Sequence, residues 1–150
     1  MSQVIAGEDV YAIAQDIFAS MVDGDVGTIV PWEGPPPGWQ EPVTAWVDLQ
    51  GDWAGRASLT TETSTAHALA RALLGFGEDE PVERADLVDA FGEVVNVVGG
   101  NVKSLLETTG SLGLPQVADV DPGLPGGLVL SEMVLAWHGR ALELVVRAVL

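Results

Sequence analysis

Residues 83–107, ERADLVDAFGEVVNVVGGNVKSLLE, form the longest stretch of the chain in which apolar residues recur at helical spacing. At about 100° per residue, the apolar side chains gather on one face of the predicted helix and a polar row gathers on the opposite face. The apolar face comprises Leu87, Phe91, Val94, Val95, Val98, Val102 and Leu105; the polar row comprises Asp89, Glu93, Asn96, Gly100 and Lys103. The pattern therefore predicts a helix that points an acid and an amide, Glu93 and Asn96, away from the core.

Three glycines, Gly92, Gly99 and Gly100, lie beside this polar row. Each costs on the order of 1 kcal/mol relative to alanine inside a helix. Because glycine has no side chain, it allows another backbone to approach closely. That backbone could belong to a neighbouring element of the same fold or to a separate protein. A solvated helix face with glycines that admit a packed helix is the plainest interpretation of the pattern taken alone.

Outside this helix, the sequence predicts two further helices and two antiparallel hairpins. The helices are expected at 8–22 and 63–75, and the hairpins at 43–61, turning at Gly51-Asp52, and at 128–150, turning near His138-Gly139. A proline-rich segment, 31–42, is expected to be a surface loop. The order of elements predicts an α+β fold, an antiparallel sheet with helices packed on one face.

Composition limits the classes of protein and partner. A chain of 150 residues with 47% hydrophobic content is expected to form a single domain over 1–150, with the loop at about 31–42 as an insertion. A net charge of -16 repels phosphate backbones and anionic lipids, so no nucleic acid and no membrane surface is expected as a partner. With no cysteine, thiolate metal sites and disulfides are excluded, and no metal site of its own is expected. The amino terminus lacks the features of a signal peptide, so a cytoplasmic location is expected.

The polar row carries a resemblance to a known family. Asp89-x-x-x-Glu93-x-x-Asn96 matches the D/S-x-x-x-E-x-x-N signature of the CheC/CheX/FliY family of chemotaxis-type phosphatases, and Gly100-Asn101 stands where CheX-like members commonly have a Gly-Asn pair. Residues 51–75 are similar to the family's glycine-marked hairpin followed by a helix rich in alanine and leucine. The chain from about Val43 onward thus resembles a CheX-like domain.

The resemblance implies dephosphorylation of the aspartyl phosphate of a CheY-like response regulator, with Mg²⁺ bound by the regulator and no cofactor bound by this chain. It assigns Asn96 to orienting the attacking water and Glu93 to pairing with the regulator's active-site lysine. An amide is suited to positioning water, and phosphoryl transfer depends on positioning more than on covalent help. Partner contacts are expected from the rest of the motif face: Asp89, Gly92, Gly99, Gly100 and Lys103.

The first predicted helix tests for a second copy of the site. Aligning Glu8 with the first motif position places Ala12 and Gln15 at the glutamate and asparagine positions, so this copy is expected to be inactive. A single site is CheX-like rather than CheC-like, and the resemblance then implies a homodimer. The alternating run at the carboxyl terminus is a candidate pairing edge, although an edge shielded within the monomer is an equal alternative.

The sequence leaves two alternatives for the downstream proline of the signature and more than one for the function. The family signature continues to a downstream proline, and both Pro115 and Pro122 are candidates for it. The alternative to a phosphatase is a non-catalytic CheX-like module that binds a receiver domain or another signalling partner, and an acidic scaffold with no role for the motif explains least of the helix.

Overall fold

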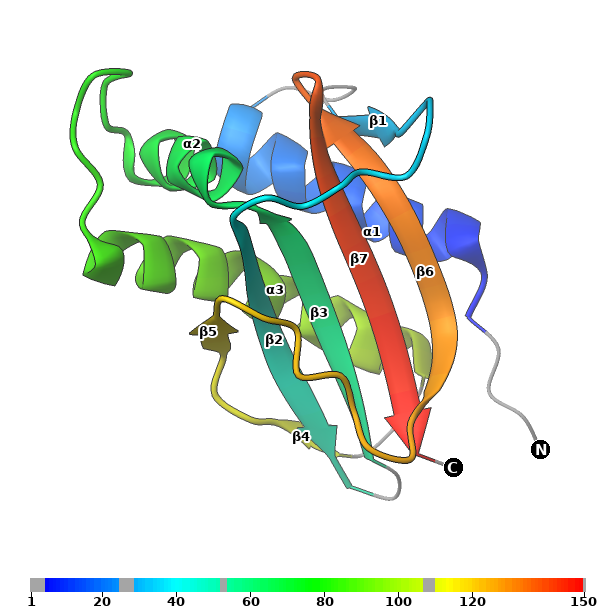
Figure 1. The fold of residues 1–150 in the computed structure, drawn as a ribbon. Helices are drawn as coiled ribbons and strands as arrows, with labels where there is room; N and C mark the ends of the chain where they lie inside the picture. The colour runs from blue at the N-terminus through cyan, green and yellow to red at the C-terminus, as the bar shows by residue number, and fades with distance from the viewer. Residues whose placement is uncertain (1–4, 25–28, 52–53, 107–109, 150) are drawn as a thin grey trace.

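An antiparallel sheet covered by helices forms the fold, seen face-on in Figure 1. The computed structural model describes residues 5–24, 29–51, 54–106 and 110–149. The helices are α1 (Gly7–Ile17), the π-helical segment η1 (Phe18–Asp23), α2 (Thr63–Leu74) and α3 (Arg84–Leu106). The strands are β1 (Ile29–Pro31), β2 (Pro42–Gln50), β3 (Ala54–Glu62), β4 (Ser111–Leu112), β5 (Gln116–Ala118), β6 (Leu128–Trp137) and β7 (Arg140–Val149).

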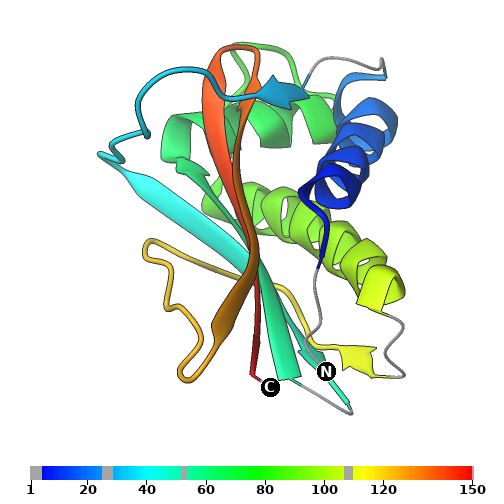
Figure 2. The ribbon, with the colours of Figure 1, turned by 90° about the vertical axis from the view of Figure 1, so that its right-hand side faces the viewer.

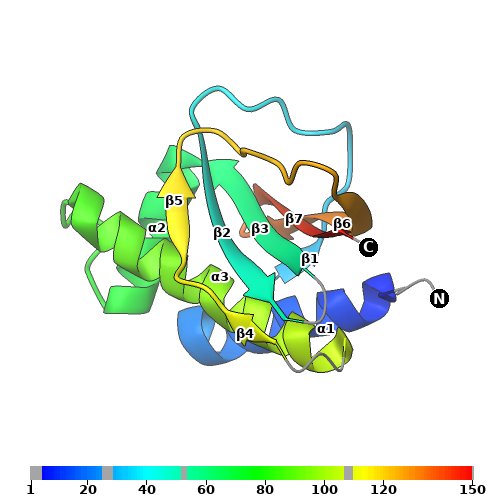
Figure 3. The same cartoon turned by 90° about the horizontal axis from the view of Figure 1, so that it is seen from below.

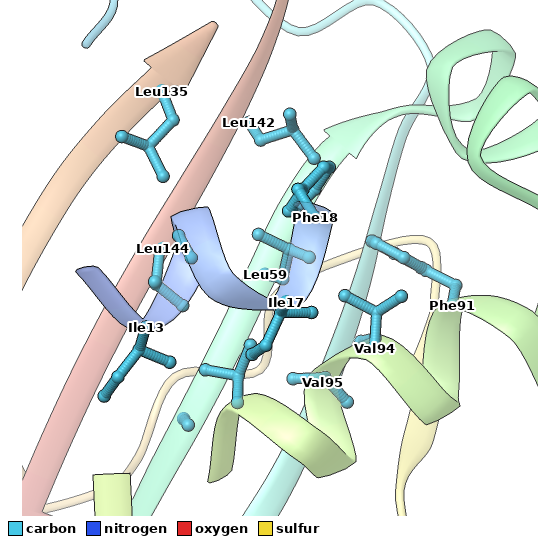
Figure 4. Packing of buried hydrophobic residues seen from close by; sticks show 14 of the residues in the cluster. Ile13, Ile17, Phe18, Leu59, Phe91, Val94, Val95, Leu135, Leu142 and Leu144 are labelled. Atoms are coloured by element: carbon cyan, nitrogen blue, oxygen red, sulfur yellow. The ribbon is translucent and has the colours of Figure 1, made fainter. Parts of the chain in front are cut away.

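The helices lie together on one face of the sheet (Figure 2). In β2, Val43, Ala45 and Val47 are fully buried and alternate with residues that point to the opposite face. The core fills the space between this face and the helices, where apolar side chains of α1, η1 and α3 meet those of β3, β6 and β7 (Figure 4). The predicted α+β fold, an antiparallel sheet with helices packed on one face, is confirmed.

The apolar face of α3 is buried as its periodicity predicts, with one difference at the end of the helix. Six of the seven predicted residues are at most 2% exposed: Leu87, Phe91, Val94, Val95, Val98 and Val102. Leu105, which was expected to share this face, is 40% exposed. The buried side of the helix therefore ends at Val102, and Ser104 and Leu105 after it are exposed.

The two predicted hairpins are present and lie side by side in the sheet. The strand order is β1-β6-β7-β3-β2-β4, and β5 also pairs with β2. Strand β7 pairs with β6 on one side and with β3 on the other, in a register that runs from Thr61↔Leu142 to Ala54↔Val149. Of the two alternatives for the carboxyl-terminal run, the pairing edge is not found, because β7 is paired on both sides within the chain. In the turn of the first hairpin, Asp52 lies outside the described residues, as do Glu107 and Leu150 at the predicted ends of the long helix and the last strand.

The remaining elements follow the sequence closely. The α-helix expected over 8–22 begins at Gly7 and ends at Ile17, after which the chain widens into η1. The proline-rich segment is a loop whose bounding prolines end β1 and begin β2, positions where a missing N–H costs little. Gly75 ends α2 in the left-handed conformation, with a φ of 73°. None of the helices in the described ranges combines the length and apolarity needed to span a bilayer.

The face of the sheet opposite the helices carries a polar network. The segment between β5 and β6 crosses in front of β2 and β3 in Figure 1. Arg56 pairs with Asp48 at 2.6 Å and donates to the carbonyl oxygen of Gly123 in that segment. Arg147 pairs with Asp121 at 3.3 Å. Two of the six basic residues in the chain therefore hold this segment against the sheet.

Glu143, on the same face, makes the stability of the protein depend on pH. Burial raises the pKa of Glu143 above its ordinary value of 4.5, the negative charges of Glu132 and Asp121 raise it further, and Arg147 lowers it. Since the ionised form is disfavoured only in the folded protein, Glu143 stabilises the fold below the unfolded-state pKa, and this contribution is lost as the pH rises through the folded-state pKa.

Glu143→Gln is therefore expected to raise the free energy of unfolding at pH 7, with no difference from wild type below about pH 4.5. Urea unfolding at both pH values, with the exposed Glu33→Gln as control, tests this; a loss of stability at pH 7 would contradict it.

Candidate functional site

The outer side of α3 presents Glu93 and Asn96 to solvent. Glu93 is exposed and Asn96 is half-buried, whereas Val94 and Val95 between them are 1% and 0% exposed. The helix repeat produces this contrast, because residues three positions apart share one face while the two between them turn toward the sheet. The pair therefore lies one helical turn apart, with about 5–6 Å between the Cβ atoms.

Neither side chain of the pair is engaged within the described ranges. No hydrogen bond or ion pair joins the Glu93 carboxylate or the Asn96 carboxamide to another residue there. Asn101, further along the same helix, differs, since its side-chain amide donates to the carbonyl oxygen of Val97 at 2.8 Å. The acid and the amide of the motif are thus available to an incoming molecule, whereas the Asn101 amide is used within the helix.

Side chains of the same chain pack against Gly92 and Gly99 of α3, and the approach at Gly99 leaves no room for a larger residue. A Cβ added at Gly92 would lie 3.4 Å from Cβ of Pro115. A Cβ added at Gly99 would overlap with Cγ1 of Val47 on β2 and lie 3.4 Å from Cδ2 of Leu112. Of the two alternatives that the sequence left open, the atoms next to these glycines belong to this fold, but they are side-chain atoms rather than the backbone that was expected.

This packing changes the set of residues that can contact a partner. Gly92 and Gly99 were expected among the partner-binding residues, but both are buried beneath residues of the same chain. A visiting protein does not reach these two buried residues directly in this structure, so their predicted contact with a partner stays a prediction that the geometry does not support. Gly100 and Lys103 are half-buried and Asp89 is exposed, and these three remain on the accessible side of the helix.

Residues 112–115, which comprise the last residue of β4 and its connection to β5, lie alongside the motif helix. Figure 3 shows β4 and β5 running alongside α3. Asn96 follows Gly92 by four residues and precedes Gly99 by three, so it occupies the same side of the helix as these glycines. Because Pro115 covers Gly92 and Leu112 covers Gly99, the Asn96 side chain lies at the border between the exposed row and segment 112–115.

The structure also distinguishes the two candidate prolines. Pro115 packs against Gly92, next to Glu93 in sequence. Pro122 lies between Asp121 and Gly123, which contact Arg147 and Arg56 on the opposite face of the sheet. Pro115 is therefore the proline that neighbours the motif helix.

Helix α1 packs beside α3. It has the same pattern of buried and outward-facing positions but lacks the acid of the motif. Ile13 and Ala14 are buried, while Ala12 is exposed and Gln15 is half-buried. These two outward positions correspond to Glu93 and Asn96 in the alignment of the two helices. Because alanine carries no functional group, α1 presents no acid-and-amide pair at this place.

A family model and several solved structures match this chain. A family model described as "Chemotaxis phosphatase CheX" matches residues 43–123. A chain of the CheX–CheY–BeF3–Mg²⁺ complex from Borrelia burgdorferi is 16% identical, with a TM-score of 0.72 over 97% of this chain and 99% of that chain. The chemotaxis protein CheX from Desulfovibrio desulfuricans is 22% identical, with a TM-score of 0.69 over 93% and 96% of the two chains.

More distant matches have the same fold. A CheC-like superfamily protein from a Shewanella species is 15% identical, with a TM-score of 0.64 over 94% of this chain and 95% of that chain. FliY from Thermotoga maritima is 19% identical, with a TM-score of 0.52 over 95% and 91%. No curated protein sequence matches the chain at a significant level.

Proposed function

The chain belongs to the chemotaxis phosphatase CheX family, and from this premise we propose that it dephosphorylates the aspartyl phosphate of a CheY-like response regulator. The observation that carries the proposal is the outward-facing pair of Glu93 and Asn96 on α3, whose side chains have no hydrogen-bond or ion-pair partner in the described part of the chain. The similar fold in a CheX–CheY complex that contains BeF3 and Mg²⁺ supports a receiver domain as the partner. The proposal is that α3 docks against the receiver's active site and that both side chains enter it.

In this mechanism, Asn96 positions the water that attacks phosphorus. Its carboxamide accepts a hydrogen bond from the water through Oδ1 and has two N–H donors left for phosphate oxygens. The water oxygen forms a bond to phosphorus while the bond between phosphorus and the aspartyl oxygen breaks. The aspartate leaves as a carboxylate, and the water protons pass to the released phosphate and to solvent. An amide needs no change of protonation in this role, because in-line positioning supplies most of the acceleration.

Glu93 is proposed to orient the complex rather than to act on the water. Its carboxylate would pair with the lysine of the receiver's active site, and Mg²⁺ on the receiver would neutralise charge that develops on the phosphoryl oxygens. Asp89, one turn before Glu93 on the exposed side, adds negative charge to the same surface. On this proposal the receiver supplies the metal and the phosphorylated group, and this chain supplies the geometry.

Phosphate release from a panel of phosphorylated receiver domains tests the proposal. The wild-type protein is expected to accelerate phosphate loss from at least one receiver, and Glu93→Ala and Asn96→Ala are expected to lose that acceleration. If the wild-type protein binds a phosphorylated receiver without accelerating phosphate loss, the binding module is correct instead. Equal rates for wild type and both variants would contradict a catalytic role for the pair.

The role of Glu93 predicts a specific kinetic change. Glu93→Gln keeps the size of the side chain and removes its charge, so the ion pair with the receiver's lysine is lost. We expect KM to rise about tenfold, because an ion pair shielded from water at an interface contributes on the order of 1–2 kcal/mol. The matched control is Glu83→Gln, which removes the same charge just before the start of α3. An equal rise in KM for both variants would indicate a general effect of charge and contradict this role.

A further inference from the structure

We propose that Leu114 is the apolar anchor of the docking surface and binds an apolar patch of the receiver domain beside its phosphorylated aspartate. The inference rests on the proposed function, since it assigns a partner contact to the same site. It adds a residue that lies outside α3 and outside the motif. The partner that fits is a receiver domain with an apolar patch flanking the acyl phosphate.

Leu114 is exposed to a degree that packing within this chain does not explain. Its exposed fraction is 84%, the largest among the exposed large hydrophobic residues in the described ranges. The residues on either side of it are half-buried, so the backbone lies on the protein while this one side chain points away from it. A single exposed leucine is common on protein surfaces and means little by itself. Its position next to the motif is what gives it a role.

The segment that carries Leu114 is held in place at three points. The backbone N–H of Gly113 donates to the carbonyl oxygen of Asp48 on β2 at 2.8 Å. Pro115 packs against Gly92, and Leu112 pairs with Leu49 of β2 while its side chain covers Gly99. The backbone on both sides of Leu114 is thereby fixed, so a partner would bind this side chain without the entropic cost of ordering a loop.

The same contacts place Leu114 in a segment that runs along the side of α3 carrying Asn96. Segment 112–115 borders the side of α3 that carries Asn96, because its two ends cover the glycines on either side of that residue. Leu114 lies between these two ends. A receiver domain that accepts Asn96 therefore meets Leu114 at the rim of the same surface.

An apolar anchor also suits the charge of this protein. With a net charge of -16, the molecule repels an acidic partner at long range, and the exposed acids Asp89 and Glu93 lie on the docking surface itself. Burial of a leucine contributes affinity that salt does not screen, in contrast to surface ion pairs. Leu114 would therefore hold the complex at physiological ionic strength, while Glu93 and Asn96 act within the active site.

The experiment compares Leu114→Ser with a matched control, Leu128→Ser. Leu128 is 57% exposed and pairs with Ala148 at the start of β6, separated from β2 by two strands. Two quantities are measured for each variant: the kinetics of phosphate release from a phosphorylated receiver, and the Kd for the same receiver activated with beryllofluoride and Mg²⁺. Leu114→Met, which keeps the apolar character, is included as the conservative variant.

We expect Leu114→Ser to raise both KM and Kd about tenfold and to leave kcat within about twofold of wild type. Leu128→Ser is expected to keep the wild-type values, and Leu114→Met is expected to raise KM and Kd less than Leu114→Ser does. Wild-type KM and Kd in Leu114→Ser, or an equal loss in Leu128→Ser, would overturn the anchor and leave the proposed function intact. A wild-type protein that neither binds nor dephosphorylates any receiver in the panel would overturn both.

Discussion

Replacing Asn96 with alanine is expected to lower the rate of receiver dephosphorylation by at least about 100-fold, because the attacking water loses the group that aligns it with phosphorus. The affinity for the receiver is expected to stay within about twofold of wild type, since the Asn96 side chain makes no hydrogen bond or ion pair within the described ranges and its removal leaves the docking surface in place. Single-turnover phosphate release measures the first quantity, and titration with a beryllofluoride-activated receiver measures the second.

The same helix provides the control for this prediction. Asn101 is an exposed asparagine five residues after Asn96, and its side chain is bonded to the carbonyl oxygen of Val97. Asn101→Ala removes an amide of the same size from the same helix and is expected to keep the wild-type rate within about threefold. If Asn101→Ala loses activity as fully as Asn96→Ala, the effect arises from the helix rather than from the positioning of water.

The second large effect is expected from Gly99→Ala, which should lower the free energy of unfolding by about 1–3 kcal/mol. The added methyl group would overlap with Cγ1 of Val47, a branched side chain that is 0% exposed and cannot move aside without shifting β2. Helix propensity acts in the opposite direction and favours alanine by about 1 kcal/mol. The steric cost is expected to exceed this gain, because both the helix and the strand are fixed by the core.

Gly100→Ala is the matched variant one position along α3. A Cβ at Gly100 would meet only Cδ1 of Leu112, at 3.8 Å, which is an ordinary contact. The helix preference of alanine should therefore prevail, and the free energy of unfolding is expected to rise by up to about 1 kcal/mol. Urea unfolding of the two variants measures both values. A change of the same sign in both would contradict the assignment of Gly99 alone to the close approach of β2.

The sequence predicts the layers of this fold because the patterns behind them are local. The helical period of residues 83–107 determines which side of α3 faces the sheet, and the buried face from Leu87 to Val102 follows it. The alternation in 43–50 and in the carboxyl-terminal run predicts strands, and a glycine predicts the end of α2. Each of these features depends on residues within one or two turns of one another.

Local sequence patterns do not predict features that depend on pairing between distant parts of the chain. The strand β7 was a candidate for an edge of the sheet but pairs on both sides, because alternation alone carries no information about neighbours. The strands β4 and β5 are two and three residues long, too short to give a periodic signal. Gly99 signalled a close approach, but only the tertiary structure shows that side chains make it and identifies them as those of Val47 and Leu112.

The local features of the candidate site are predictable from the sequence, whereas those that depend on distant pairing are not. The outward direction of Glu93 and Asn96 follows from helical geometry, so the sequence predicts it. The position of segment 112–115 beside α3 was not predicted. Those residues follow the helix in sequence and return beside it only because β4 and β5 pair with β2. A leucine placed between a glycine and a proline is the one sequence signal that marks an exposed, fixed turn there.

In the proposed mechanism, Glu93 and Asn96 enter a receiver's active site together. The most direct test is a crystal structure of this protein bound to a receiver domain activated with beryllofluoride and Mg²⁺. We expect α3 to face the beryllofluoride, with the Asn96 carboxamide within about 3 Å of the water or fluoride in line with the acyl oxygen, and with Glu93 paired to the active-site lysine. A complex in which the receiver binds another face, and both side chains remain in solvent, would contradict the claim.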